Sequence, residues 1–449
     1  MVGDESDGED PDEGMTTETI CAIATPPGAG GVGIVRVSGS LVPVLAVSLV
    51  GQLPKPRLAT RALFRRPDLT PIDDGLVLYF PAPTSFTGEA VLELQGHGSP
   101  VVQDQLLRTL IEQGARLARP GEFSERAFLN GKIDLIQAEA VADLINSATE
   151  AAARAALLTL HGAFSDALNG IHDRLVALRT RLEAGLDFPD EDIEAAEDTV
   201  LTEALSAVAT EIGVLLTRTR EGRLLREGAT LVLAGLPNAG KSTLLNALVG
   251  TEAAIVSPVP GTTRDLVREQ INLDGIPVRL IDTAGIRQST DMIEQEGVRR
   301  AQTAMEMADY VCWLVDDSDS TPSTPPPQSM VVYTKIDRTG RSPGRTVDGC
   351  AICAQTGAGL GALRALLKER LRGGSTLSAD TFTARRRHVV ALQEMASCLQ
   401  RALGHQRERA LELVAEELRR AHHLLGEMTG VFTTEDLLGE IFSHFCIGK

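Results

Sequence analysis

Hydrophobic and polar positions divide the chain into three kinds of pattern. Between residues 15 and 135, short apolar runs are bounded by Gly, Pro and Asp clusters, which is typical of strands; these runs cover 20–24, 33–37, 76–80 and 90–95. From Ile136 apolar residues recur at spacings of three, four and seven, which predicts helices packed on other helices. From Thr230 to about residue 372, strand-like and helix-like segments alternate, as in a parallel α/β domain.

The helical pattern occupies two separated stretches. The first pauses at Asp187-Phe-Pro-Asp190 and resumes over about 199–226, and the second follows Gly373-Gly374. Both could belong to one bundle into which the α/β domain is inserted, because a bundle tolerates an insertion where its ends lie close together. We therefore predict an α/β multidomain chain with an α+β domain at 15–135, a helical domain at 136–226 and 375–449, and an inserted α/β domain at 227–374.

Composition and charge narrow the function classes. The 449 residues are 43% hydrophobic and 23% charged, an ordinary globular composition. The net charge is −18, which disfavours holding nucleic acid by the overall field alone. Residues 1–14 carry seven acidic residues and no Lys or Arg, so we predict a disordered tail; without it the charge is −11.

Targeting and membrane segments are not predicted. The acidic start fits neither a secretory signal nor a transit peptide. The longest apolar run, at 41–50, contains a proline and is about half the ~20 residues that a membrane span needs. We expect a cytoplasmic protein.

Two weaker motifs favour structural roles. Cys350 and Cys353 form an isolated C-x-x-C without a second ligand pair nearby, so a buried strand is favoured over a redox or zinc site. The run 28–33 fits G-x-G-x-x-G, but its last glycine leads into a strand rather than a helix. A turn between two strands is therefore favoured over a dinucleotide site.

The segment from Gly235 to Ser242 matches the P-loop pattern in full. It reads Gly-Leu-Pro-Asn-Ala-Gly-Lys-Ser and lies between an apolar strand and a helix. Backbone N–H groups of such a loop wrap phosphate oxygens at the helix N-terminus. We expect Lys241 to reach the β- and γ-phosphates and the Ser242 hydroxyl to bind Mg²⁺.

Further motifs point to guanine nucleotides. Asp282 ends an apolar strand, where it can hold Mg²⁺ through water, and Thr263 lies in a segment resembling a first switch. Asp337 can accept hydrogen bonds from guanine N1 and N2, which adenine cannot offer. The predicted GTP-binding residues are Asn238, Ala239, Gly240, Lys241, Ser242, Thr243, Ser257, Pro258, Val259, Pro260, Gly261, Thr262, Thr263, Asp282, Thr283, Ala284, Gly285, Thr334, Lys335, Asp337, Cys353, Ala354 and Gln355.

Three positions depart from the commonest GTPase pattern. Thr334 replaces the usual Asn, but Asp337 is kept, so guanine specificity is expected to survive. Cys353 replaces the usual Ser, and the Ala354 N–H is expected to contact the guanine oxygen. Ile286 stands where many GTPases carry a Gln; isoleucine cannot orient water, so either hydrolysis is weak or another group assists it.

The motif set resembles the MnmE (TrmE) family of tRNA modification GTPases, which belongs to the TrmE-Era-EngA-like GTPases. Besides the GTPase motifs, the resemblance extends over nearly all of 18–449 and is carried by segments 24–28, 30–34, 85–89, 93–98, 120–130, 187–190 and 445–449. It implies an N-terminal tetrahydrofolate-binding and dimerisation domain, a helical domain, and an inserted P-loop G domain.

The resemblance also implies a folate site. Its contacts would be Arg36, Glu89, Lys132 and the terminal Lys449, with 5-formyl- or 5,10-methylene-tetrahydrofolate as ligand. Cys446 lies beside Lys449 and is a candidate for chemistry there, although a structural role is favoured.

For hydrolysis, the resemblance implies a K⁺ ion in place of an arginine finger. Asn238, Ser257, Val259 and Thr262 match its ligand positions, and the ion would drive pairing of two G domains. Glu294 matches the residue that positions the water-activating network, so Glu294, Asp282 and Lys241 are the expected catalytic residues.

The leading hypothesis is the GTP-hydrolysing subunit that modifies C5 of the wobble uridine (U34). It would form a homodimer, act with the FAD-dependent MnmG (GidA) in a heterotetramer, and leave most tRNA binding to that partner, with no membrane involved. Two alternatives stay open: a ribosome-assembly or regulatory GTPase, and a folate-binding transferase with a vestigial G domain. The intact Lys241, Ser242, Thr263, Asp282 and Asp337 argue against the second.

Overall fold

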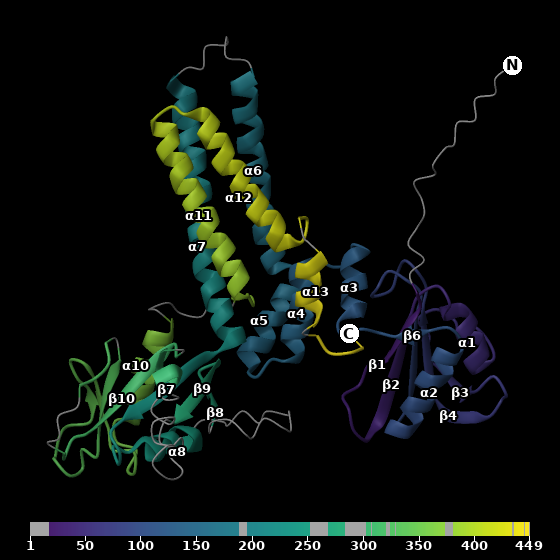
Figure 1. Cartoon of the computed structure of the whole chain (residues 1–449), viewed down its shortest axis with the longest axis horizontal. Helices are drawn as coiled ribbons and strands as arrows, with labels where there is room; N and C mark the ends of the chain where they lie inside the picture. Colours follow the sequence, from purple (N-terminus) through teal and green to yellow (C-terminus); the bar gives the residue numbers. More distant parts are fainter. Residues whose placement is uncertain are drawn as a thin grey trace. The chain divides into compact units, whose positions relative to one another are not determined.

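The computed structural model describes residues 18–187, 195–251, 268–282, 302–306, 308–319, 324–327, 329–372, 380–432, 435–443 and 445–448. The chain forms two compact units, one from Met1–Ala138 with Thr433–Lys449 and one from Glu139–Phe432 (Figure 1). The predicted limits of the three domains stay predictions.

The first unit is built on a six-stranded sheet with the order β3-β4-β5-β2-β1-β6. Among these six strands, β1 and β6 pair in parallel and the other neighbours pair antiparallel. The elements are β1 (Ile20–Ile23), β2 (Gly30–Ser38), α1 (Val42–Val50), β3 (Thr60–Arg65), β4 (Pro71–Phe80), β5 (Val91–Gly98), α2 (Pro100–Glu112), β6 (Arg116–Leu117), α3 (Glu122–Leu129), α13 (Glu435–Ser443) and the start of α4 (Leu135–Ile145).

The two faces of this sheet have different neighbours. Val35, Val37, Leu92 and Leu94 join a buried cluster with residues of α1 and α2. Because side chains alternate along a strand, Arg36 and Glu93 project from the opposite face. There, Phe123 of α3 packs with Ile20 and Ala22 of β1, and the Arg36 guanidinium lies 5.8 Å from the centre of its ring.

The end of the chain packs in the first unit. The Gly121 amide donates to the Cys446 carbonyl (3.4 Å), and Arg36 donates to the Gly448 carbonyl (3.2 Å). Gly448 adopts a φ of 95°, and a Cβ there would clash with the carbonyl of Ile23. The structure therefore groups residues 433–449 with the N-terminal unit, and the predicted limits of the helical domain, 136–226 and 375–449, stay a prediction.

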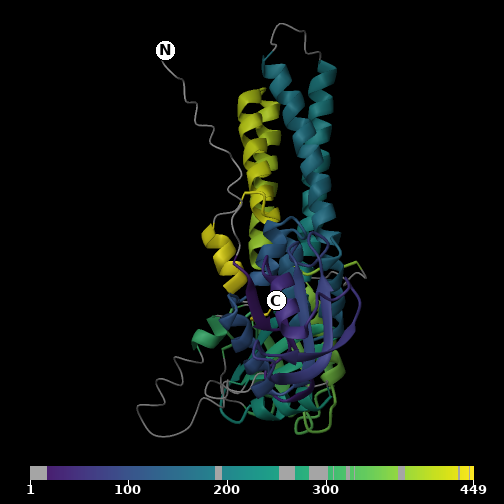
Figure 2. The ribbon, with the colours of Figure 1, turned by 90° about the vertical axis from the view of Figure 1, so that its right-hand side faces the viewer.

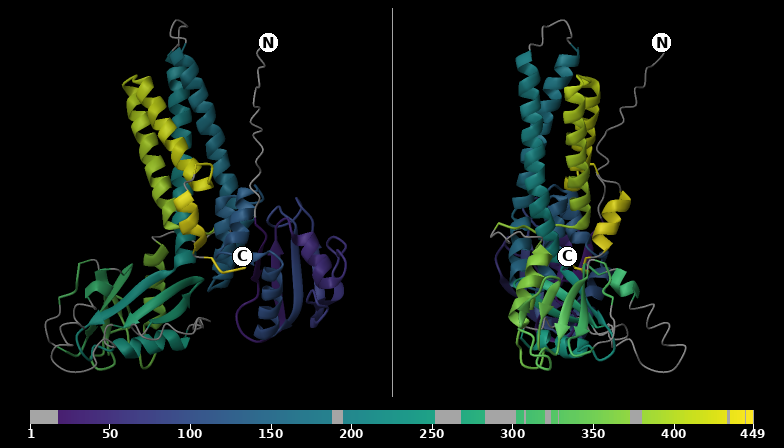
Figure 3. Two further views of the ribbon diagram at one scale, coloured as in Figure 1. Left: turned by 45° about the vertical axis from the view of Figure 1, so that its right-hand side comes forward. Right: turned by 90° about the vertical axis from the view of Figure 1, so that its left-hand side faces the viewer.

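Four long helices of the second unit form a bundle, as the apolar stripes predict. Each contacts two others in the order α6, α7, α11, α12 and back to α6. Figures 2 and 3 show α11 and α12 running side by side. Their bounds are α6 (Ala163–Asp187), α7 (Ala195–Glu227), α11 (Arg386–Arg407) and α12 (Leu411–Thr429), and the shorter α5 (Glu150–Leu160) precedes α6.

The segment between α7 and α11 confirms the predicted inserted α/β domain. Its seven strands have the order β12-β13-β11-β10-β7-β9-β8, and all neighbours are parallel except β8 with β9 and β12 with β13. The bounds are β7 (Ala229–Gly235), α8 (Lys241–Thr251), β8 (Arg268–Leu273), β9 (Ile276–Asp282), β10 (Tyr310–Asp316), β11 (Met330–Thr334), β12 (Gly344–Arg345), β13 (Gly349–Ala351) and α10 (Leu360–Arg372).

The α/β domain also contacts the helical part directly. The Thr149 hydroxyl, which caps α5 by accepting from the Ala152 amide, donates to the Gly275 carbonyl in the β8–β9 turn (2.8 Å). Ala155 of α5 and Leu225 of α7 belong to the buried cluster of the α/β domain. Residues of both helices therefore pack against the core of the α/β domain.

The helix predicted over about 199–226 is observed within α7. Within the described residues, Thr199–Glu227 is long and apolar enough to cross a membrane by length and composition alone. Its inward positions Leu201, Leu205, Val208 and Ile212 are buried within the bundle, so the segment is weak support for a membrane span.

Candidate nucleotide-binding site

The P-loop joins β7 to α8 through a backbone that needs its glycines. Gly235 has a φ of 143°, and a Cβ there would clash with the Leu314 carbonyl of β10. Gly240 has a φ of 89°, and Asn238 also adopts a left-handed conformation with a φ of 63°. The loop thus reaches the N-terminus of α8, where backbone N–H groups can bind phosphate.

Lys241 extends over this loop. Its ammonium donates to the carbonyls of Gly235 (2.9 Å) and Leu236 (2.8 Å), and the residue is 6% exposed. The charge is thus held at the loop by neutral carbonyl groups, where a phosphate would attract it more strongly.

Ser242 and Asp282 bring two oxygen donors together. The Ser242 hydroxyl donates to Asp282 Oδ2 (2.7 Å), and Asp282 is buried at the end of β9. The register that pairs Asp282 with Leu233 of β7 places the carboxylate beside the P-loop. A hydroxyl and a carboxylate are ligands that Mg²⁺ accepts, so this pair fits the predicted metal.

Thr334 ties the base-reading segment to the P-loop. Its hydroxyl contacts the carbonyls of Ala239 (2.8 Å) and Val315 (3.2 Å), and the side chain is buried. Threonine at the usual Asn position therefore still links β11 to the loop. Asp337, three residues on, is exposed, so its carboxylate is accessible to a base.

The other base-side residues lie beyond β13. Cys353 is buried, Ala354 is half-buried and Gln355 is exposed. The Cys353 amide donates to the Ala358 carbonyl (2.9 Å), and its carbonyl accepts from Gly357 (3.0 Å). Cys350 lies within buried β13, as the sequence predicts.

Two neighbouring acids were missed by motif reasoning. Asp316 ends β10 and pairs with Lys335 (2.6 Å), and Asp317 pairs with Arg341 (2.7 Å). A pair of acids directly after an apolar strand, at the carboxyl edge of a parallel sheet, is a signal that could have identified them.

Several predicted residues lie outside the described residues. They are Ser257, Pro258, Val259, Pro260, Gly261, Thr262, Thr263, Thr283, Ala284, Gly285, Ile286, Glu294 and Lys449. Of the predicted K⁺ ligands only Asn238 is described, so the fit of that ion is tested by one residue alone.

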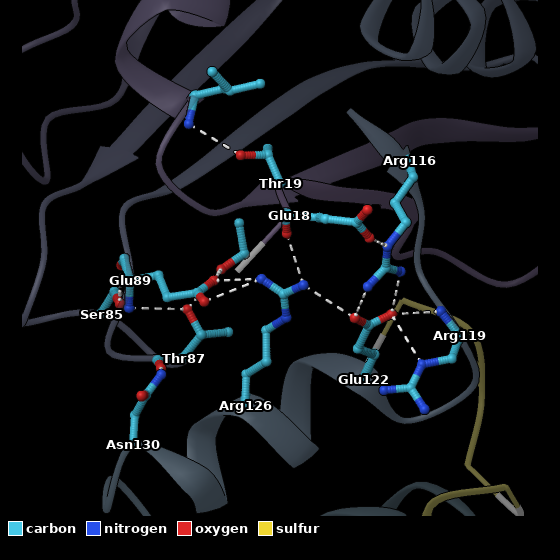
Figure 4. A network of polar contacts seen from close by, with 12 residues as sticks. Glu18, Thr19, Ser85, Thr87, Glu89, Arg116, Arg119, Glu122, Arg126 and Asn130 are labelled. Atoms are coloured by element: carbon cyan, nitrogen blue, oxygen red, sulfur yellow. Dashed lines mark hydrogen bonds and ion pairs between the residues drawn. The ribbon is translucent and has the colours of Figure 1, made fainter. Parts of the chain in front are cut away.

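In the first unit, the predicted folate residue Glu89 is part of an ion-pair network (Figure 4). Both its oxygens accept from Arg126 (3.0 Å each), and Oε2 also accepts from Ser38 (2.7 Å). Arg126 in turn pairs with Glu122 (3.0 Å). Since a carboxylate has about four lone-pair sites, Glu89 keeps room for roughly one further donor.

Glu122 is the most strongly compensated acid of this network. Its side chain is 2% exposed. Burial alone would raise its pKa, but hydrogen bonds from Arg116, the Arg119 amide and Arg126 outweigh burial and lower the pKa to about 2. The group is therefore ionised at neutral pH and serves the fold.

Arg36 and Lys132 differ in how their charges are compensated. Arg36 donates twice to Glu93 (3.0 and 2.9 Å) and once to the Gly448 carbonyl, so its charge is already paired. Lys132 is exposed and makes no ion pair with a described residue. Its Cε lies 3.4 Å from where a Cβ on Gly88 would stand, next to Glu89.

The sequence was compared with known proteins. It matches the family models described as GTP-binding protein TrmE N-terminus, at residues 19–132, and MnmE helical domain, at residues 135–446. The tRNA modification GTPase MnmE of Alkalilimnicola ehrlichii is 51% identical, and the match covers 97% of this chain and all of the relative. Those of Proteus mirabilis and Methylococcus capsulatus are each 48% identical, over 97% and 96% of this chain and 100% and 99% of the relatives.

Proposed function

Because the chain belongs to the MnmE (TrmE) family of tRNA modification GTPases, we propose that its GTP hydrolysis drives modification of C5 of the wobble uridine (U34). The observation that supports this most directly is the Ser242–Asp282 contact beside the P-loop, with Asp337 exposed on the base side. Residues for phosphate and metal binding and the residue for base recognition would thus lie at the same edge of the sheet.

In this mechanism the chain mainly positions the triphosphate. Lys241 moves from the loop carbonyls to the β- and γ-phosphate oxygens, and Asp337 accepts from the guanine base. Ser242 and Thr263 would hold Mg²⁺ directly, and Asp282 would hold it through a water molecule. When bound, the metal offsets charge on the phosphates.

We further propose that K⁺ promotes pairing of the G domains. Asn238 would contribute one ligand, with Ser257, Val259 and Thr262, and Glu294 would order the attacking water in the absence of a Gln at position 286. GTP turnover should then be faster in K⁺ than in Na⁺, and Asn238→Ala should abolish the difference. Equal rates for the unaltered protein in both salts would refute the cation site.

The folate proposal is centred on Lys132. Its uncompensated ammonium beside Glu89 can attract a carboxylate of tetrahydrofolate, and Glu89 can accept from a pterin donor. The one-carbon unit would then be supplied next to the docked C-terminal segment. Lys132→Met should weaken binding of 5-formyl-tetrahydrofolate about tenfold, whereas Lys55→Met, at another exposed lysine of the same unit, should not.

The proposed assembly is a cytoplasmic homodimer that joins the FAD-dependent MnmG. The excess of acidic residues supports a division of labour in which MnmG holds most of the tRNA. The decisive experiment is nucleoside analysis of tRNA from cells lacking this protein. Loss of the C5 group at wobble uridines is expected; unchanged tRNA, or co-purification with ribosomal subunits rather than MnmG, would favour a ribosome-assembly role.

A further inference from the structure

The base-reading segment is anchored on both sides of Asp337. On one side, Lys335 has a left-handed φ of 55° and its ammonium lies 2.6 Å from Asp316 Oδ2. Ile336, next along the chain, is 3% exposed and packs into a small core cluster. On the other side, Thr339 and Arg341 are held by Asp317.

Asp316 is itself fixed by its own loop. Its second oxygen accepts from the Ser318 amide (3.0 Å) and the Ser318 hydroxyl (2.7 Å). Burial would raise the pKa of Asp316, but the bonds from Lys335 and Ser318 outweigh it and lower the pKa. The carboxylate is therefore charged at neutral pH and can hold the lysine in its unusual conformation.

Asp317 links the same two segments a second time. Its amide donates to the Thr334 carbonyl (3.0 Å), and its carboxylate accepts from the Thr339 hydroxyl and pairs with Arg341 (2.7 Å). The Asp317 side chain is 6% exposed, and the Arg341 guanidinium lies 4.2 Å from the centre of the Tyr333 ring. The last residue of β10 and the residue after it are thus two adjacent anchors for the segment that follows β11.

We propose that Asp316 and Asp317 are positioning residues for guanine recognition, which act by fixing residues 334–341 so that Asp337 meets the base. Asp316 and Asp317 hold the two ends of the turn that carries the exposed Asp337, and so they set the orientation of its carboxylate. This inference rests on the proposed nucleotide site and adds to it the residues that set its selectivity.

The test compares nucleotides that differ only where Asp337 acts. Inosine diphosphate lacks the 2-amino group of GDP, so the ratio of the two dissociation constants reports the placement of Asp337. Asp316→Asn should weaken GDP binding about tenfold and reduce that ratio, and Asp317→Asn should do so about threefold. Inorganic tripolyphosphate, which contacts only the phosphate side, should bind each variant as it binds the unaltered protein.

Two controls separate positioning from general damage. Glu369→Gln removes an exposed acid of the same domain that pairs with Arg345, and it should leave the nucleotide ratio unchanged. Combining Asp316→Asn with Lys335→Met should give less than the sum of the two single effects, because both act through one contact.

The possible outcomes are distinguishable. If both Asp316→Asn and Asp317→Asn keep the GDP affinity and the GDP-to-inosine ratio within twofold, the positioning role is refuted. A parallel loss of tripolyphosphate binding would also refute it, since the damage would not be confined to the base. Failure of the unaltered protein to bind GDP would instead overturn the proposed nucleotide site.

Discussion

The nucleotide site and the ion-pair network of the first unit use the same residue types in opposite ways. In the network, Glu122 is almost completely buried and meets the guanidinium groups of Arg116 and Arg126. In the nucleotide site, Lys241 donates to two neutral carbonyls of the P-loop, and Asp337 is exposed and makes no ion pair with a described residue. Charges that the protein compensates stabilise the fold, whereas those it leaves uncompensated are available to a ligand.

The comparison bears on the predicted folate residues. Glu89 and Arg36 are each paired with a charged neighbour, so they resemble the network more than the nucleotide site. Lys132 alone of the described three makes no ion pair with a described residue. We therefore expect Lys132 to contribute most to ligand attraction and Arg36 to contribute mainly through its contact with the C-terminal segment.

The largest expected effect comes from removing the Lys241 ammonium at the P-loop. Lys241→Ala should lower GTP turnover about 1,000-fold, because the developing phosphate charge loses its closest cation. Thermal unfolding should change little, because the bonds to the Gly235 and Leu236 carbonyls are local to the loop. Steady-state phosphate release measures the first quantity.

Lys368→Ala is the matched control, because Lys368 lies on α10 of the same domain and pairs with Asp274 at the surface. Its turnover should equal that of the unaltered protein. A loss of stability in Lys241→Ala comparable to a core mutation would show that Lys241 belongs with the compensated charges.

Glu122→Gln tests whether a buried, compensated charge stabilises the fold. Loss of this buried carboxylate leaves Arg116 and Arg126 undercompensated, so the free energy of unfolding should fall by about 3–5 kcal/mol. Chemical denaturation of the full chain, followed by a probe in the first unit, measures it. GTP turnover under native conditions should be retained.

Asp104→Asn removes an exposed partner of Arg108 on α2 and serves as control, with an expected change below about 0.5 kcal/mol. Equal stabilities for Glu122→Gln and Asp104→Asn would contradict the structural role of the network.

The P-loop could be predicted from the sequence, whereas the ion pairs could not, for a physical reason. The P-loop is contiguous, so Gly235, Lys241 and Ser242 are identified by spacing alone. Asp316 meets Lys335 only because β10 and β11 pair in parallel with Asp316 opposite Thr334. Arg126 lies 37 residues from Glu89, and no local pattern marks their contact.

The same distinction holds for secondary structure. Strongly periodic helices and alternating strands were predicted close to their observed limits. Helix α1 is apolar along much of its length and gives no helical stripe, whereas β3 has only one fully buried position. Helix α1 forms by packing against the sheet and β3 by pairing with β4, and the local pattern encodes neither contact.

Lowering the pH should have a somewhat smaller effect on the free energy of unfolding, through the protonation of Glu122. The folded-state pKa of Glu122, about 2, lies below its ordinary value of 4.5, so its stabilisation is complete above pH 4.5 and is lost as the pH falls towards 2. At pH 3 the loss should be about 2 kcal/mol. The difference in unfolding free energy between the unaltered protein and Glu122→Gln should shrink by that amount between pH 6 and pH 3. A constant difference would contradict the assignment.

The smallest expected effect concerns the Thr334 hydroxyl, which is neutral and yet serves the ligand site. Thr334→Val keeps the shape and removes the bond to the Ala239 carbonyl, so GDP affinity should fall about fivefold. Thr334→Asn should restore most of it, because an amide can also donate to that carbonyl. Equal affinity for Thr334→Val and the unaltered protein would mean that the P-loop keeps its position without β11. The loop would then depend on its own glycines, and the departure from Asn at this position would have no consequence for binding.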